Sequence, residues 1–428
     1  MTDNLIHFLF FLLQSMPIIT NQIYLDHKIV KWIAMKYLPF NFFDDQETQE
    51  FFTLLNPKIN MPKRTTMRAK VVQVFTDIQK SVIDTLMQNK SKISFTLDGW
   101  TSVAGKSYYG ITAHFINDDW KLVSVALDFV ASNGRHTGKD IAEIFFACLK
   151  DKGILEKIQG ITLDNAASNS TFIEQFGKLM INNSLVFDVE NQHFRCFAHI
   201  LNLAVQDSLK KLVSEETRED EIDNDDDYES VKTSVLKLRS IFIKLKRSEQ
   251  LRNKLKSSCY ITNTKYLSPI IDVATRWNST YDMIECGLSM RSALNALCST
   301  SNDMNIERFL LTDDEWYLLK QISVFLKNFK LVSTLLGGDK YATLPLFIVA
   351  FNMLLDKIEN MMQLLNHKED RCGTDENLLL AFQAARDKLI KYYNKTNWIY
   401  CIVLLLDPRH KLETFNLTNW GKELLSQS

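Results

Sequence analysis

Apolar and polar positions along the chain change their period near residue 90 and again near residue 213. Before the first change, apolar residues recur at helical spacing, for example at Ile29, Trp32, Ile33 and Tyr37. Such spacing predicts amphipathic helices. We therefore expect a small helical module over residues 1–90, with a further helix over 44–55 and another over 71–88.

From residue 92 the pattern alternates, which predicts strands. Three strands are expected at Ile93–Asp98, Tyr108–Ile116 and Lys121–Ala131, with a turn at Gly99–Ser102. Helices and strands then alternate, with a helix at 137–150, a strand at 158–163, a helix at 165–181, a strand at 194–197 and a helix at 198–212. Three meandering strands followed by this alternation is the ribonuclease H topology. Residues 91–213 are therefore predicted to form a ribonuclease H-like core.

Beyond this core the pattern is almost wholly helical. Residues 214–231 are too acidic to bury and are expected to form a disordered loop. Residues 232–415 are expected to form a helical insertion domain. Residues 416–428 are expected to be a truncated C-terminal end. The predicted fold class is α/β plus all-α, with a mixed ribonuclease H-like sheet interrupted by a large helical insertion.

The amino-acid composition indicates a globular protein with reduced thiols, and it shows how charge is distributed along the chain. The 428 residues are 46% apolar and 24% charged, which is typical of a globular protein and excludes a membrane-embedded or largely disordered chain. The seven cysteines are scattered, which favours reduced thiols. The net charge of −1 conceals two opposed segments, an acidic one at 215–229 and a basic helix at 232–256. The apolar run Leu5–Leu13 is too short to span a membrane.

Two aspartates end apolar strands that both read Thr-Leu-Asp. Asp98 ends the first strand and Asp164 the fourth, and these strands are adjacent and parallel in a ribonuclease H-like sheet. Paired carboxylates on rigid strands suit Mg²⁺, which prefers hard oxygen ligands. The structural alternative is that each aspartate caps the following turn.

A basic stretch that contains Lys63 and Arg64 precedes the helix predicted at 71–88. These side chains are candidates for contacts with a DNA phosphate backbone. The alternative is a solvated helix face.

Five blocks of sequence carry a resemblance to a known family. They begin at Thr96, Ile161, Arg195, Asp272 and Leu406, and read TLDGWTS, ITLDN, RCFAHILNL, DVATRWNST and LDPRHKL. In order and approximate spacing the chain resembles the hAT-superfamily transposases, including their BED-finger, RICESLEEPER-like relatives. The resemblance covers about residues 20 to 415.

The resemblance implies Mg²⁺-dependent cleavage and strand transfer of DNA, and hence a nuclear protein. Asp98 and Asp164 match the first two catalytic and metal-binding acids of the family. Arg276 and Trp277 match its Arg-Trp pair near the flanking DNA, although a tryptophan at such a helix start also suits a core. Cys196 and His199 match its Cys-x-x-His, for which a packed thiol and a hydrogen-bonded histidine are the structural alternative.

The chain also departs from the family pattern. It contains no Ser-rich Glu-Arg-x-Phe-Ser segment, which carries the third catalytic acid of the family beyond the Leu-Asp-Pro-Arg block. The C-terminal segment that usually mediates homodimerisation is missing as well, and so is a BED finger. We therefore expect a truncated transposase relative that binds transposon ends or host DNA and is catalytically incomplete.

Two other functions stay open at this stage. In the first, Glu143 supplies the third carboxylate of a Mg²⁺-dependent ribonuclease H-style nuclease, since it lies on the helix between the third and fourth strands. In the second, the chain is a non-catalytic interaction protein. Its helical domain then binds a protein partner, while the acidic loop shields the basic helix or mimics DNA.

Overall fold

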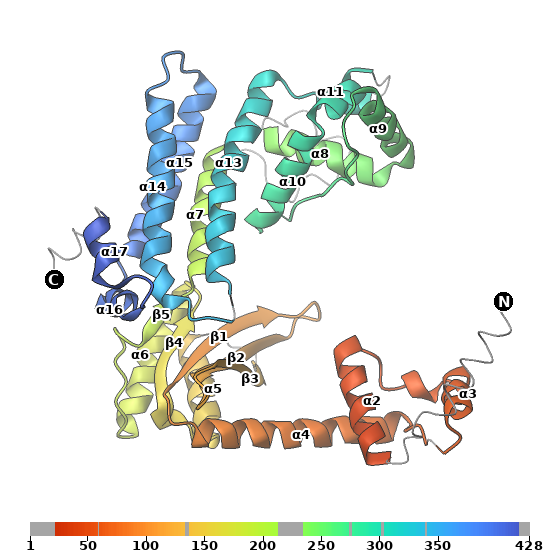
Figure 1. Ribbon diagram of the computed structural model, residues 1–428, viewed down its shortest axis with the longest axis vertical. Helices are drawn as coiled ribbons and strands as arrows, with labels where there is room; N and C mark the ends of the chain where they lie inside the picture. Colours follow the sequence, from red (N-terminus) through yellow and green to blue (C-terminus); the bar gives the residue numbers. More distant parts are fainter. Residues whose placement is uncertain are drawn as a thin grey trace.

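The computed structural model describes residues 22–58, 60–132, 137–212, 234–273, 276–300, 304–338 and 340–418. The predicted acidic loop 214–231, the apolar run Leu5–Leu13 and most of the predicted end 416–428 lie outside these residues. The described chain packs around three separate hydrophobic cores. Figure 1 shows them as an N-terminal group of helices, a layer of strands and a larger group of long helices.

The N-terminal core joins helices α2 (Gln22–Lys36), α3 (Gln46–Leu55) and the first turns of α4 (Arg64–Gln88). Helix α4 begins earlier than the predicted start at Val71. The backbone N–H of Arg64 donates to the Asp44 carboxylate at 2.9 Å, which satisfies a donor that a helix start leaves unpaired. At its other end α4 contributes Leu86 to the core of the sheet, so this single helix connects the two parts (Figure 1).

The sheet has five strands in the order β3-β2-β1-β4-β5. The outer pairs β1–β2 and β2–β3 are antiparallel, and β1–β4 and β4–β5 are parallel. The strands are β1 (Ile93–Thr101), β2 (Ser107–Ile116), β3 (Leu122–Ala131), β4 (Ile158–Leu163) and β5 (His193–Arg195). The predicted ribonuclease H-like mixed sheet is confirmed.

The turn predicted at Gly99–Ser102 is wrong, because β1 continues through Thr101. Thr101 pairs with Ser107, and the Trp100 ring stacks on Tyr108 with ring centroids 5.8 Å apart. The chain reverses instead after Ser102, whose carbonyl accepts from the N–H of Gly105 at 2.9 Å. Pairing with β2 and the aromatic contact outweigh the turn-like composition of this stretch.

Helices α5 (Gly138–Asp151) and α6 (Ala167–Asn182) cover one face of the sheet. Apolar residues at every second strand position meet the apolar stripe of each helix. Phe145 of α5 lies at the centre, with its ring 5.7 Å from Phe95 of β1 and 5.3 Å from Phe176 of α6. The opposite face of β1 and β4 carries Thr96 and Thr162, which are only half-buried.

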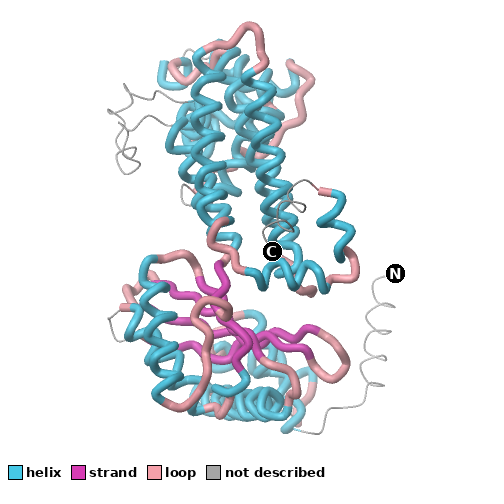
Figure 2. Tube along the Cα trace, turned by 90° about the vertical axis from the view of Figure 1, so that its left-hand side faces the viewer, coloured by secondary structure: helices cyan, strands magenta, loops and turns pink. Residues whose placement is uncertain are grey.

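The helical part begins with α7 (Phe197–Leu212), directly after β5. It continues through α8 (Ser234–Arg247), α9 (Glu249–Ile261), α10 (Trp277–Ser289), α11 (Arg291–Thr300), α12 (Met304–Glu307), α13 (Asp313–Leu336), α14 (Phe347–Asn366), α15 (Gly373–Tyr393), α16 (Trp398–Leu406) and α17 (Lys411–Leu417). The long helices extend away from the strands (Figure 2). None of the helices in the described part of the chain has the length and apolar character that a bilayer span requires.

The basic segment predicted as one helix over 232–256 contains two helices. Helix α8 ends at Arg247, and the Ser248 hydroxyl accepts from the N–H of Leu251 to cap α9. A serine in this position stabilises a new helix start more than a continuing helix. The helical periodicity of the sequence is unchanged across this break, so periodicity alone does not reveal it.

The hydrophobic core divides at β5, inside the segment 91–213 that the sequence grouped as one unit. All the buried apolar residues of α7 belong to the helical core. The chain returns to the sheet through α16, where the Tyr400 ring lies 5.7 Å from Phe194 of β5 and its hydroxyl accepts from the Arg195 N–H at 3.4 Å. The helical part is therefore attached to the edge strand at both ends.

Candidate functional site

Asp98 and Asp164 lie at equivalent positions beside each other on parallel strands. Thr96 of β1 pairs with Thr162 of β4, and each aspartate follows its threonine by two residues. Side chains alternate between the faces of a strand, so Asp98 lies on the same face as Thr96, and Asp164 directly follows the end of β4. The intervening Leu97 is buried on the other face. The sheet thus brings these two predicted site residues together.

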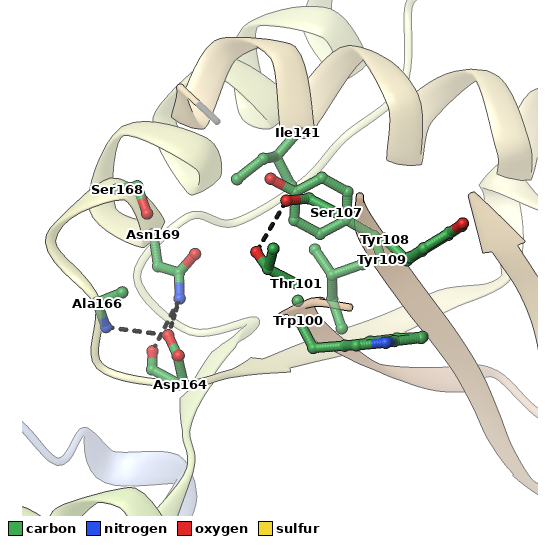
Figure 3. A pocket seen from close by; sticks show the side chains of 12 residues that line it. Trp100, Thr101, Ser107, Tyr108, Tyr109, Ile141, Asp164, Ala166, Ser168 and Asn169 are labelled. Atoms are coloured by element: carbon green, nitrogen blue, oxygen red, sulfur yellow. Dashed lines mark hydrogen bonds between the residues drawn. The ribbon is translucent and has the colours of Figure 1, made fainter. Parts of the chain in front are cut away.

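Asp164 is held by the start of α6. Its Oδ1 accepts from the backbone N–H of Ala166 at 3.0 Å and from Nδ2 of Asn169, which also donates to the Asp164 carbonyl at 3.1 Å (Figure 3). The capping role that the sequence left open for Asp164 is therefore present. It is compatible with a metal-binding role, because both carboxylate bonds use the same oxygen and fix the orientation of the other.

Cys196 lies close to both carboxylates. Its N–H donates to the Leu163 carbonyl at 2.7 Å, and its carbonyl accepts from Nδ2 of Asn165 at 3.2 Å. Burial raises the pKa of the Cys196 thiol, backbone N–H groups at the start of α7 lower it, and the negative charges of Asp164 and Asp98 raise it further. The thiol caps α7, which is the packed role that the sequence kept as its alternative for this cysteine.

A pocket of about 280 Å³ opens beside Asp164. One wall is polar and consists of Asp164, Ser168 and Asn169 at the start of α6. The other wall comes from the β1–β2 hairpin and α5 and includes Trp100, Thr101, Tyr109 and Ile141 (Figure 3). Trp100 is 43% exposed, so its ring is accessible to a ligand. The pocket therefore combines a carboxylate with an aromatic surface.

The donor set at this place fits a divalent cation only in part. Asp98 and Asp164 offer the hard oxygens that Mg²⁺ prefers. No group of three or more His, Cys, Asp or Glu side chains arranged for a metal exists among the residues that the structure describes. Glu143 lies on the exposed side of α5, where Lys139 approaches it to 3.9 Å. Among the described residues, its carboxylate forms no three-ligand group with the two aspartates.

Lys63 and Arg64 lie far from the carboxylates. Both are exposed at the start of α4, beside the N-terminal core. Helix α4 has 25 residues, and at about 1.5 Å of rise per residue it is about 37 Å long. Only its opposite end reaches the sheet, through Leu86. These two cations thus belong to a separate surface.

The block DVATRWNST around residue 276 has a structural explanation. Asp272 is buried and accepts two bonds from the Arg239 guanidinium, at 2.7 and 2.8 Å, and a third from the Thr280 hydroxyl at 3.0 Å. Trp277 is only 4% exposed and packs against Phe329 of α13. The core position that the sequence left open for Trp277 is the one it occupies.

Arg276, in contrast, is exposed in front of α10. Its backbone N–H donates to the Val273 carbonyl at 2.7 Å, and its carbonyl accepts from the Ser279 hydroxyl at 2.6 Å. Arg276 and Trp277 match one motif, but the structure exposes the arginine and buries the tryptophan. Of the two side chains, only that of Arg276 is accessible from outside the protein.

The sequence alone assigned no role to Asn169. Its side chain is the group that orients Asp164. The signal for it is a helix start directly after a strand-terminal aspartate, which places a residue five positions later one helical turn above the carboxylate. Trp100 was also missed as a ligand surface, because its stretch was predicted to be a turn.

Comparison with family models divides the chain at β5, where the hydrophobic core divides as well. Residues 96–191 match the model of the ZBED1 RNase-like domain, and residues 194–325 match that of the ZBED1 RNase-like helical domain. The two matches meet between residues 191 and 194.

Curated proteins match across most of the chain. The putative AC transposase of Zea mays is 29% identical over 382 residues, which cover 89% of this chain and 44% of that protein. The putative transcriptional regulator tpeD of Talaromyces stipitatus is 26% identical, covering 92% of this chain and 45% of the regulator. The zinc finger BED domain-containing protein RICESLEEPER 2 of Oryza sativa is 22% identical, covering 90% and 49%. The chain spans about half the length of these relatives.

Proposed function

The chain is an hAT-type transposase relative with an RNase-like domain. From this we propose that it binds DNA beside Asp98 and Asp164, which lie on the neighbouring inner strands β1 and β4 or directly after them. The supporting observation is the equivalent register of the two carboxylates, one within β1 and one directly after the adjacent parallel strand β4. We further propose that it acts in the nucleus, where its DNA partner is found.

We propose that Asp98 and Asp164 hold Mg²⁺ against a DNA phosphate. A bound divalent cation at such a place supplies charge neutralisation and activation of a water or hydroxyl nucleophile. Asn169 and the Ala166 N–H hold the Asp164 carboxylate in one orientation, while Asp98 stays exposed to the incoming ligand. Two carboxylates position a phosphate but leave one ligand fewer than a two-metal centre uses. We therefore propose that the described residues bind DNA without cleaving it.

Trp100 is the proposed contact for an unpaired base, in place of Trp277, which matches the tryptophan of the family's Arg-Trp pair. It is accessible and lines the same pocket as Asp164, whereas Trp277 is in the core. Aromatic rings bind bases without sequence preference, because every base presents a π face. Arg276 stays a candidate for a phosphate contact.

The metal proposal is tested by titration of Mn²⁺ into the protein, followed by calorimetry. We expect binding that is lost in Asp98→Asn and in Asp164→Asn and retained in Glu143→Gln. The last variant is the matched control, since it removes an exposed carboxylate of the same domain that lies near Lys139. Equal binding by all four proteins would exclude the two aspartates as ligands.

The DNA proposal is tested by fluorescence anisotropy with a labelled duplex at several salt concentrations. Neutralised phosphates give a steep fall of log K with log salt. A parallel incubation with Mg²⁺ tests cleavage. Robust cleavage that disappears in Asp98→Asn would show that the protein is an active nuclease or transposase and would refute the proposed incompleteness.

A protein-interaction role is the second candidate function. Helix α4 carries Val72, Phe75 and Ile78 near its middle, each of them more than half exposed. Apolar side chains gathered on one surface are typical of protein contacts. Absence of measurable DNA binding at low salt would favour this function over the first.

A further inference from the structure

A basic cavity lies between helices α7 and α15, away from the residues discussed so far. Its volume is about 440 Å³, and four lysines line it together with two aspartates and an alanine, namely Lys210, Lys211, Lys388, Lys391, Asp207, Asp387 and Ala384. Lys388 pairs with Asp207 at 2.7 Å, and Asp387 accepts from Gln383 at 2.6 Å. Lys210, Lys211 and Lys391 are exposed, and none of the three forms an ion pair with any carboxylate in the described ranges.

The positive surface continues from this cavity to the sheet. Lys395 follows α15, and burial together with the charges of Arg195 and Lys391 lowers its pKa. The hydroxyl of Tyr400, on the helix that follows Lys395, accepts from the Arg195 N–H at 3.4 Å, so this part of the chain lies against Arg195. Arg195 is on β5 directly opposite Leu163, which precedes Asp164. The cations therefore form a continuous track, hereafter the α7–α15 track, from the edge of the carboxylate site up the two helices.

The basic run at 232–256 offers a contrast. Most of its cations make contacts within the helical part: Lys237 pairs with Glu315 at 2.6 Å, Arg239 with Asp272, and Arg252 donates to the carbonyls of Leu245 and Lys246. Lys244 and Lys256 lie over aromatic rings. Most cations of the basic run 232–256 are thus used in contacts within the helical part. The α7–α15 track instead has six cations against two carboxylates, namely Arg195, Lys210, Lys211, Lys388, Lys391 and Lys395 against Asp207 and Asp387.

The length of the track suits a nucleic-acid backbone. Helix α7 has 16 residues, and at about 1.5 Å of rise per residue it is about 24 Å long. Phosphates of one DNA strand advance about 3.4 Å per nucleotide along the duplex axis, so this length matches about seven nucleotides. Lysines on mobile stems follow such a backbone without reading its sequence.

We propose that the α7–α15 track binds the phosphate backbone of the DNA duplex whose adjoining segment lies at Asp98 and Asp164. This inference rests on the proposed DNA binding and names the surface that carries it. Arg195 marks the passage from the track to the carboxylates. The contacts are with phosphates, so the track contributes affinity and orientation and leaves sequence recognition to other residues.

The test is the salt dependence of DNA binding by a triple variant, Lys210→Gln, Lys211→Gln and Lys391→Gln. The probe is a fluorescein-labelled duplex of about 30 base pairs, and each lost phosphate contact lowers the log–log slope by about 0.9. We expect the slope to fall by about 2 to 3. The matched control removes three exposed lysines on other elements, Lys80, Lys121 and Lys254, and we expect a change in slope of less than about 1.

The outcomes separate this inference from the proposed function. If the unmodified protein fails to bind the duplex at low salt, both are refuted. If it binds with a steep slope that the triple variant retains, only the α7–α15 track is refuted. An RNA duplex of the same length that competes more strongly than DNA would overturn the assignment of the track to DNA.

A second measurement needs no variant. Lysine acetylation of the unmodified protein, followed by peptide mass spectrometry, reports which amines the duplex protects. We expect DNA to protect Lys210, Lys211 and Lys391 and to leave Lys80, Lys121 and Lys254 as reactive as before. Protection of neither set, or of the second set alone, under conditions of saturated binding would contradict the proposal.

Discussion

Asp98 and Asp164 are separated by two strands and a helix in the sequence, yet the pairing of β1 with β4 places them at equivalent register. Each follows a threonine of the Thr96–Thr162 pair by two residues. The negative charges of both carboxylates contribute to raising the pKa of the Cys196 thiol. Asp98 and Asp164 therefore form a single anionic site. Arg195 of the α7–α15 track lies beside this site, opposite Leu163 on the neighbouring strand.

Trp100 and Trp120 allow a matched test of base stacking. Trp100 is 43% exposed beside Asp164, and Trp120 is 89% exposed in the β2–β3 hairpin. We expect Trp100→Ala to weaken binding of single-stranded DNA by about 1 to 3 kcal/mol, because one aromatic platform is lost. Anisotropy titrations at fixed salt measure the change. Trp120→Ala is expected to leave the affinity unchanged, and an equal loss in both variants would contradict a specific role of Trp100.

The Arg239–Asp272 pair should contribute strongly to stability. Removal of the cation leaves the Asp272 carboxylate buried without its bidentate partner, and uncompensated buried charges cost about 3 to 5 kcal/mol. We therefore expect Arg239→Met to lower the free energy of unfolding by this amount in urea titrations. Arg291 pairs with the exposed Asp313, so Arg291→Met should cost at most about 1 kcal/mol. Similar losses in the two variants would refute the assigned importance of burial.

Trp277 should behave as a core residue. Its side chain is 4% exposed and contacts Phe329, and replacement of a buried tryptophan by alanine costs about 3 to 5 kcal/mol. We expect Trp277→Ala to lower stability to urea by this amount and Trp277→Phe to lower it less. The exposed Trp398 provides the control, since Trp398→Ala removes a ring that is 60% accessible. Unchanged stability of Trp277→Ala together with weaker DNA binding would instead support the direct DNA contact.

His193 should make stability depend on mildly acidic pH. Burial and the neighbouring Arg195 lower the pKa of the His193 imidazole to about 4, compared with about 6.5 in an unfolded chain. Between these values the unfolded state binds the proton and the folded state does not. Stability therefore falls as the pH decreases from about 6.5 to 4, by at most about 3 kcal/mol.

The contribution of His193 is isolated by comparing the unmodified protein with His193→Gln in urea titrations across this pH range. The variant should lose less stability on acidification than the unmodified protein. The exposed His27 serves as the control in a His27→Gln variant, which should keep the full dependence. Identical pH profiles for the unmodified protein and His193→Gln would show that His193 is not the titrating group.

Local pattern was sufficient for most elements of the sheet domain. The pattern located β4 at Ile158–Leu163 without error, because an apolar run of this length is typical of a strand and too short for an ordinary helix. It failed at Gly99–Ser102, where pairing with β2 extends the strand. It also failed at Ser248, because a helix cap is a single-residue feature within unbroken helical periodicity.

The sequence by itself determined the order of strands and helices, the two Thr-Leu-Asp segments and the family motifs, because these depend on residues close together in the chain. Tertiary structure alone decided that Trp277 is buried while Arg276 is exposed, and that α7 belongs to the helical core. It also decided which cations are available. Arg195, Lys210 and Lys391 gather only when α15 packs against α7, whereas the conspicuous basic run at 232–256 is largely occupied by its own neighbours. Charge is a property of the sequence, but whether a charge is free to meet a ligand depends on the partners that folding brings to it.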